Sequence, residues 1–212
     1  MYQISHEIFE ELKNDVLNSW AVWNEDGNNT LDFFQSKLDI LNSRFVFLGL
    51  NRSNGAERNE HTPFRNFHAG RHVGDNRLKK IIQDEVLENL IGSFMTDLTI
   101  EVQTDSTKVK VNEETTVNKL IEKLSFMRCP QRSIICFGEK VFESICSGLK
   151  VERGKIIELP EFHLKKATVH VAGEQWTIYR VWHYSNYGRF LHKSEEELPK
   201  QLQYINTHEA NE

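Results

Sequence analysis

Four short runs of mainly apolar residues dominate the pattern of the chain. They lie at residues 44–50, 92–98, 133–137 and 175–182, and read RFVFLGL, GSFMTDL, SIICF and QWTIYRVW. Strands that are apolar without strict alternation are typical of a parallel sheet that is buried on both faces. The segments between them contain stretches with helical spacing of apolar residues. The pattern predicts a single-domain, three-layer α/β/α fold with a central, mainly parallel sheet of four strands.

The remaining elements follow from periodicity and turn residues. We expect an N-terminal helical segment over about residues 1–42 and a core over about 44–207, within one domain that spans 1–212. Helices are predicted at 4–20, 31–41, 75–90, 115–127, from 139 onward and at 194–205. Asp75 or Asn76 is the expected N-cap of the third of these, and Glu197 stands in capping-box position to Ser194 in the last. Residues 150–174 predict short antiparallel strands with a turn at 172–174.

Polar or small residues stand at or directly after the end of each of the four apolar runs. They are Asn51, Asp97, Gly138 and His183. Because the carboxyl ends of parallel strands lie at one edge of the sheet, we expect these residues to surround one crevice. Each also has an ordinary structural interpretation, as a turn former, as a cap or ion-pair partner, or as a buried histidine with its hydrogen bonds satisfied.

The long polar segment at 52–76 is the second candidate for function. It carries four arginines and three histidines, with Phe64 and Phe67 between them. Cations interleaved with aromatic rings suit a polyanionic ligand or stacked bases, although the segment also fits a solvated lid. The spacing of the histidines matches no strong metal-ligand signature, and we expect no metal ion here.

Composition narrows the class of protein. The chain has 212 residues, of which 39% are hydrophobic and 27% charged, as in an ordinary globular domain. Three cysteines without CxxC spacing suit a reduced cytoplasmic setting, and no apolar run predicts a signal peptide or a membrane span. A net charge of −5 argues against broad non-specific binding of nucleic acid but allows a small basic footprint.

Motifs within these runs resemble those of the uracil-DNA glycosylase superfamily. FLGLNRSNG is similar to the family's first motif, a strand that ends in Gly-apolar-Asn or Gly-Gln-Asp. WHYSNYGR is similar to its second motif, His-Pro-Ser followed by a wedge loop, and FMTDL stands where the family has a strand that ends in a base-reading residue. CFGEKVF is similar to its third buried strand and following helix. The likeness covers about residues 44–205.

The resemblance implies a fold, a partner and a set of roles. It implies a uracil-DNA glycosylase-like domain that acts on DNA by base flipping, without a cofactor, and we expect a monomer. Asn51 would orient the attacking water, and His183 would donate a hydrogen bond to a carbonyl oxygen of the base. The implied base-binding residues are Leu50, Phe64, Phe67 and Asp97. The implied DNA-binding residues are Arg52, Ser53, Arg65, Ser185, Asn186, Tyr187 and Arg189, with Ser185 on a phosphate and Tyr187 as the wedge.

Several positions depart from the family's pattern. Arg52 and Tyr184 stand where the family has prolines, and no carboxylate follows Gly49-Leu50. Asp97 replaces the asparagine that reads uracil in the best-known branch. Because an ionised carboxylate only accepts hydrogen bonds, it suits the exocyclic amine of cytosine better than uracil. The implied substrate is therefore a damaged, mismatched or modified base, either uracil-like or a modified cytosine.

Two other functions fit the same residues. The first is a protein of the same fold that binds nucleic acid or a nucleotide without cleaving it, which the departures from the family favour. The second is an unrelated α/β enzyme, such as a hydrolase of a small phosphorylated ligand. The GxSxG, GxxxxGK[ST] and GxGxxG motifs of three common α/β enzyme classes are absent from the sequence.

Overall fold

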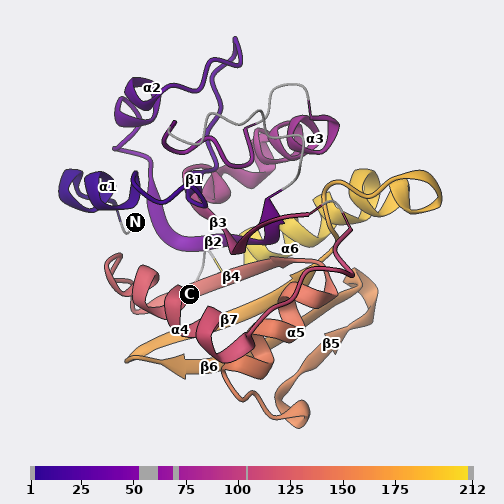
Figure 1. The fold of residues 1–212 in the computed structure, drawn as a ribbon. Coiled ribbons are helices and arrows are strands. Elements are labelled where there is room, and N and C mark those ends of the chain that lie inside the picture. The colour runs from indigo at the N-terminus through magenta and orange to yellow at the C-terminus, as the bar shows by residue number, and fades with distance from the viewer. Residues whose placement is uncertain (1–2, 53–61, 69–71, 104, 210–212) are drawn as a thin grey trace.

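The chain folds around one mixed sheet of seven strands in the order β1-β3-β2-β4-β7-β6-β5 (Figure 1). The computed structural model describes residues 3–52, 62–68, 72–103 and 105–209. The strands are β1 (Ser19–Trp20), β2 (Asn42–Arg52), β3 (Ser93–Val102), β4 (Gln131–Phe137), β5 (Ile157–Leu159), β6 (Leu164–Val171) and β7 (Glu174–Val181).

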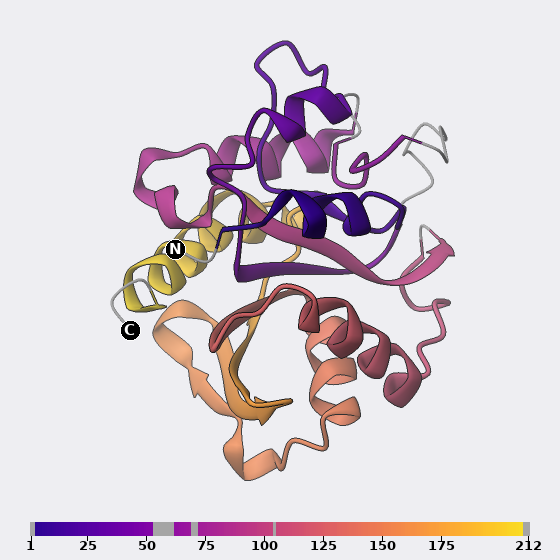
Figure 2. The ribbon, with the colours of Figure 1, turned by 90° about the vertical axis from the view of Figure 1, so that its left-hand side faces the viewer.

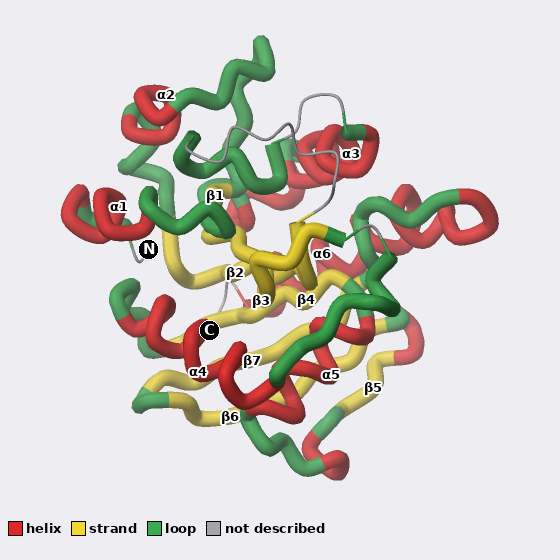
Figure 3. The backbone as a smooth tube through the Cα atoms, in the orientation of Figure 1, coloured by secondary structure: helices red, strands yellow, loops and turns green. Residues whose placement is uncertain are grey.

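The middle of the sheet matches the sequence prediction, but its edges do not. Strands β3, β2, β4 and β7 are the four apolar runs, and they pair in parallel. The expectation of four strands was wrong in number, because β1 pairs antiparallel with β3, and β6 and β5 extend the sheet antiparallel beyond β7 (Figure 3). These edge strands are short or only partly buried, so they lack a continuous apolar run.

Helices cover both faces of the sheet. They are α1 (His6–Leu12), α2 (Leu31–Gln35), α3 (Val73–Ile82), α4 (Glu113–Ser125), α5 (Glu139–Gly148) and α6 (Leu198–Glu209). Shorter helical turns are η1 (Glu85–Leu90), η2 (Arg153–Lys155), η3 (Pro160–Phe162), η4 (Gly188–Phe190) and η5 (Lys193–Glu197). None of the helices in the described part of the chain is long and apolar enough to cross a membrane.

Two buried clusters define the layers. Alternate residues of β2 separate between them: Val46 and Leu48 pack with α1, α2, α4 and α5, whereas Phe45 and Phe47 pack with α3 and α6. Figure 2 shows the yellow α6 on the opposite side of the strands from α4 and α5. Both faces of the central strands are therefore covered, which explains why their sequences are apolar throughout.

Three of the expected helices end early, and for the first of them a side-chain hydrogen bond gives the reason. The helix expected at 4–20 stops at Leu12, whose carbonyl accepts a hydrogen bond from Asn18 Nδ2 at 2.9 Å, and the chain then enters β1. The helix expected at 31–41 ends at Gln35, and the one expected at 75–90 divides into α3 and η1. Asparagine and aspartate side chains compete with helical hydrogen bonds in this way.

Two of the expected caps were wrong, and one turn was right. The N-cap of α3 is His72, which accepts a hydrogen bond from the backbone N–H of Asp75. Ser194 forms no capping box, because it lies inside the π-helical turn η5 and its hydroxyl bonds the backbone of other residues. The turn at 172–174 is confirmed: Ala172 and Gly173, with φ of 51° and 87°, join β6 to β7.

Candidate functional site

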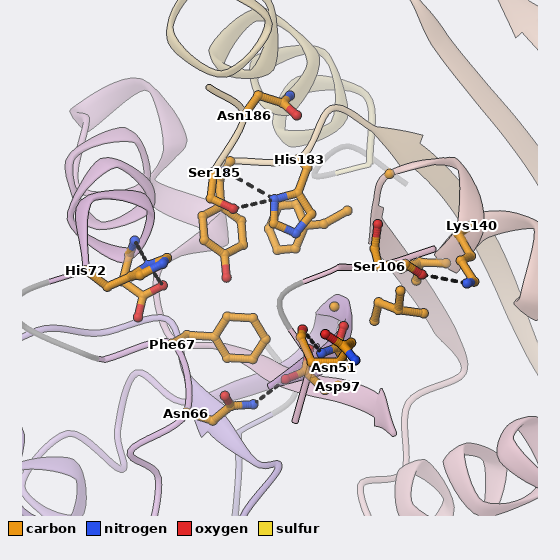
Figure 4. Close-up of a pocket in the computed structure, with 18 of the residues that line it drawn as sticks. Asn51, Asn66, Phe67, His72, Asp97, Ser106, Lys140, His183, Ser185 and Asn186 are labelled. Carbon is orange, nitrogen blue, oxygen red and sulfur yellow. Dashed lines mark hydrogen bonds and ion pairs between the residues drawn. The ribbon is translucent and has the colours of Figure 1, made fainter. Parts of the chain in front are cut away.

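A pocket of about 530 Å³ opens at the carboxyl ends of the parallel strands (Figure 4). The residues at or directly after the ends of the four apolar runs all line it: Asn51, Asp97, Gly138 and His183. Four segments that are far apart in the sequence thus contribute to one cavity, as the parallel arrangement requires. The N-terminus of α5 and the segment 183–187 after β7 form parts of its wall.

Asp97 lies buried in the pocket, beside Gly49 on the neighbouring strand. The two residues are paired in register, and a Cβ at position 49 would collide with Oδ1 of Asp97. Asn66 donates a hydrogen bond from Nδ2 to Oδ2 of Asp97 at 2.9 Å. Glycine is therefore needed at position 49 because the carboxyl group occupies the space that a side chain would take.

Burial changes the protonation of Asp97. It raises the pKa of the carboxyl group to about 7, and the nearby charge of Asp75 acts in the same direction. The hydrogen bond from Asn66 and the charges of Lys123 and Arg52 oppose this rise. At neutral pH both forms of the group are populated, so Asp97 can either donate or accept a hydrogen bond.

His183 is a neutral hydrogen-bond donor in the pocket. Its Nδ1 lies 3.1 Å from the backbone nitrogen and 2.9 Å from the hydroxyl oxygen of Ser185. Because a backbone N–H can only donate, Nδ1 must accept, and the proton of the neutral ring lies on Nε2. Burial lowers the pKa of His183 to about 4, so the ring is uncharged at neutral pH.

Aromatic rings surround this histidine. Tyr184 stacks on the His183 ring with 4.7 Å between centroids and 21° between planes. Phe137 packs against Tyr184 at 4.9 Å, and the ring of Phe67 lies 6.3 Å from it. Phe67, Phe137 and Tyr184 all line the pocket, which therefore offers flat apolar surfaces to a planar ligand.

Two hydrogen bonds from the side-chain amide of Asn51 fix the orientation of this residue. Its Nδ2 donates to the backbone carbonyls of Arg52 at 2.9 Å and Gln103 at 2.6 Å. These two bonds use both donors of the amide, so the orientation of the group is defined. The side-chain oxygen receives no hydrogen bond from the residues that the structure describes, and it is free to accept one from a water molecule or a ligand.

A pair at the rim was missed by the sequence analysis. His72 and Asp75 line the pocket at the start of α3, with 3.1 Å between Nδ1 and Oδ1. The hydrogen bond to Asp75 raises the pKa of His72. Asp75 fits the preference for acidic residues in the first turn of a helix, but nothing in the sequence indicates His72 as its partner. Asn66, also missed, has no such signal in the sequence.

Phe64 does not belong to the site. It is fully buried in the hydrophobic core, where its ring contacts Phe9 at 5.0 Å and Phe34 at 5.5 Å. The expectation that it stacks on a base was wrong. Phe64 and Phe67 both have positive φ, 58° and 64°, so the chain turns sharply and sends one ring into the core and the other into the pocket.

The other expected binding residues are only partly found in the pocket. Leu50, Ser185, Asn186 and Tyr187 line the pocket. Tyr187 is 57% exposed, and the guanidinium of the exposed Arg189 lies over the ring of Phe190. Arg52 is half-buried and Arg65 is exposed outside the pocket. Ser53 lies outside the described residues, as do His61 and Arg71 of the same segment.

Comparison with known proteins gives no assignment. No protein-family model matches the sequence, and no curated protein matches it significantly. Within the described residues, no group of three or more His, Cys, Asp or Glu side chains is placed to hold a metal ion. The function therefore has to be inferred from the chemistry of the pocket.

Proposed function

We propose that this protein is a DNA glycosylase, which flips a damaged, mismatched or modified base into the pocket and hydrolyses its N-glycosidic bond. The observation that carries the proposal is the neutral His183. Its Nε2–H belongs to the same cavity as the free acceptor of Asn51 and the buried carboxyl group of Asp97. The resemblance of the strand-end motifs to the uracil-DNA glycosylase superfamily supports the same conclusion.

The main barrier in this reaction is the negative charge that develops on the departing base. A donor that is already neutral and oriented stabilises this charge without giving up its own proton. His183 meets this requirement, because Ser185 fixes its orientation and burial holds its pKa at about 4. Its role is to hydrogen-bond a carbonyl oxygen of the base.

Water completes the reaction at the sugar. It adds to C1′ of the deoxyribose while the C1′–N bond breaks and leaves its electron pair on the base. One proton of the water passes to the base or to solvent, and the products are the free base and an abasic site. Asn51 positions this water through its side-chain oxygen, but an amide does not remove its proton, so we expect slow turnover.

Asp97 reads the edge of the base. In its charged form it accepts a hydrogen bond from an exocyclic amine, and in its protonated form it also donates. Phe67 offers a stacking surface for the flipped base. At the rim of the pocket, Tyr187 fills the gap in the stack of bases, while Ser185 and Arg189 contact the DNA backbone.

A second function is favoured by one feature of the site. The position where a general base would act is occupied by an amide, Asn51. The protein would then bind nucleic acid or a nucleotide in the same pocket without cleaving it.

Base release from a panel of oligonucleotides tests the proposal. The panel holds uracil, mismatched thymine, hypoxanthine, xanthine and modified cytosines, with alkali to reveal abasic sites. We expect cleavage of one member by the wild type and a loss of about a hundredfold or more in Asn51→Ala. Asn118→Ala, an exposed asparagine on α4, is the matched control. Salt-sensitive binding without cleavage would support the second function. The absence of both cleavage and binding would contradict both functions.

A further inference from the structure

We propose that α3 clamps the segment 183–187, the His183 loop, and that Arg77 and Asp75 are positioning residues for His183. In the free protein the clamp keeps the imidazole in its Nε2–H form. Its contribution to turnover rests on the proposed function, but its effect on the geometry of His183 does not.

Arg77 supplies the first contact. Its Nη1 donates to the backbone carbonyls of Tyr184 at 2.8 Å and Asn186 at 3.3 Å. The side chain is only 12% exposed, and Glu195 lies 3.4 Å from Nη2. One guanidinium therefore holds the two carbonyls on either side of Ser185, the residue that orients His183.

Asp75 supplies the second contact, two residues earlier on the same helix. Its carboxylate hydrogen-bonds the hydroxyl group of Tyr184, whose ring stacks on His183 at 4.7 Å. Nδ1 of His72 in turn lies 3.3 Å from the backbone nitrogen and 3.1 Å from Oδ1 of Asp75. The stacked face of the imidazole is thus fixed through Tyr184 to the start of α3.

Close packing supplies the third contact. A Cβ on Gly74 would lie 2.5 Å from Cβ of Ser185, so the backbone of α3 and the loop approach more closely than a side chain allows. Gly74, Asp75 and Arg77 together contact three consecutive residues of the loop.

The clamp accounts for a departure of this sequence from the family it resembles. Tyr184 stands where that family has a proline, and proline restricts the backbone by its own ring. In this protein, contacts with α3 restrict the backbone at position 184 instead. If the loop relaxes, the N–H of Ser185 leaves Nδ1, and the Nδ1–H tautomer of His183 becomes accessible.

The test measures the tautomer and the reaction separately. The variants are Arg77→Met, Arg77→Lys and, as a control, Lys80→Met, which removes an exposed charge from the same helix. We expect ¹⁵N NMR of the full chain to show protonated Nε2 in the wild type and Lys80→Met, and a mixture of tautomers in Arg77→Met. We expect kcat for base release to fall about ten- to a hundredfold in Arg77→Met with little change in KM, and to recover in part in Arg77→Lys.

Each outcome decides one of the two proposals. An unchanged tautomer and an unchanged kcat in a folded Arg77→Met would overturn the clamp. A changed tautomer in a protein that releases no base would support the clamp and contradict the proposed function. If Arg77→Met does not fold, Tyr184→Phe removes only the hydroxyl bond to Asp75. Retention of the wild-type tautomer ratio in that variant would then overturn the role of Asp75.

Discussion

At the scale of single residues, Asp97 is a pocket residue whose environment differs strongly from solution. Burial raises its pKa from the model-peptide value of 3.8 to about 7. Between these two values the folded protein binds a proton that the unfolded chain has lost. The contribution of Asp97 to the free energy of unfolding therefore falls as pH rises from about 4 to about 7.

Asp97→Asn should remove this pH dependence. Relative to the wild type, the variant should gain on the order of 4 kcal/mol in the free energy of unfolding between pH 4 and pH 7.5, because asparagine has no charge to bury. Urea unfolding at a series of pH values measures the difference. The buried His68 and His183, whose pKa values burial lowers to about 3 and about 4, titrate in both proteins, so their effects cancel. A difference that stays constant over this range would show that Asp97 ionises normally.

At this scale, the sequence predicted correctly those pocket residues whose place depends only on their position along a strand. Asn51, Asp97 and His183 meet in one pocket because Asn51 and Asp97 lie in the carboxyl-terminal halves of β2 and β3 and His183 follows β7, and these parts of parallel strands share an edge. The prediction for Phe64 failed because Phe64 and Phe67 both adopt positive φ, and the turns at these two residues send their rings in different directions. Asn66 and Tyr184 could not be predicted, since their contacts depend on how loops and α3 pack.

At the scale of elements, continuous apolar runs were reliable, whereas helical spacing located α4 and α5 closely but gave other helices the wrong length. The four runs became β2, β3, β4 and β7, because burial on both faces leaves a strong signal. The helix expected at 4–20 has the right spacing but is interrupted after Leu12 by side-chain hydrogen bonds of Asp15 and Asn18. Periodicity does not report such local competition.

The loop that carries Tyr187 yields the next prediction. Tyr187 is 57% exposed at the rim of the pocket, so its side chain can enter a duplex without unfolding the protein. Tyr187→Ala should lower base release from duplex DNA about tenfold more than from a single strand, because only a duplex has a stack to refill. Kinetics on matched duplex and single-stranded oligonucleotides measure this ratio.

Ile157→Ala serves as the control for this variant. Ile157 is 52% exposed on β5 and is absent from the lining of the pocket, so the ratio should stay as in the wild type. Equal losses of Tyr187→Ala on both substrates would contradict a wedge role for the tyrosine.

At the scale of the whole molecule, the two ends of the parallel strands have different tasks. The carboxyl ends open into the pocket. At the amino ends, the fully buried Arg132 at the start of β4 donates to the carbonyls of Ser43 at 2.7 Å and Met127 at 2.6 Å, and to Glu174 at the start of β7. One guanidinium thus joins the amino-terminal edges of β2, β4 and β7 to the end of α4.

Glu174→Ala should destabilise the fold without altering the reaction. Glu174 also accepts hydrogen bonds from the backbone of Cys129 at 3.1 Å and from Trp176 Nε1 at 3.0 Å. Its removal leaves the buried charge of Arg132 without a carboxylate, which costs about 3–5 kcal/mol in the free energy of unfolding. Urea unfolding measures the loss, and Glu174→Gln, which keeps an acceptor for these donors, should lose less. Because the pair lies at the edge of the sheet opposite the pocket, kcat per folded molecule should stay as in the wild type. A loss below about 1 kcal/mol would instead mean that the backbone carbonyls satisfy the Arg132 guanidinium without the carboxylate. A changed kcat would mean that the two edges of the sheet are coupled.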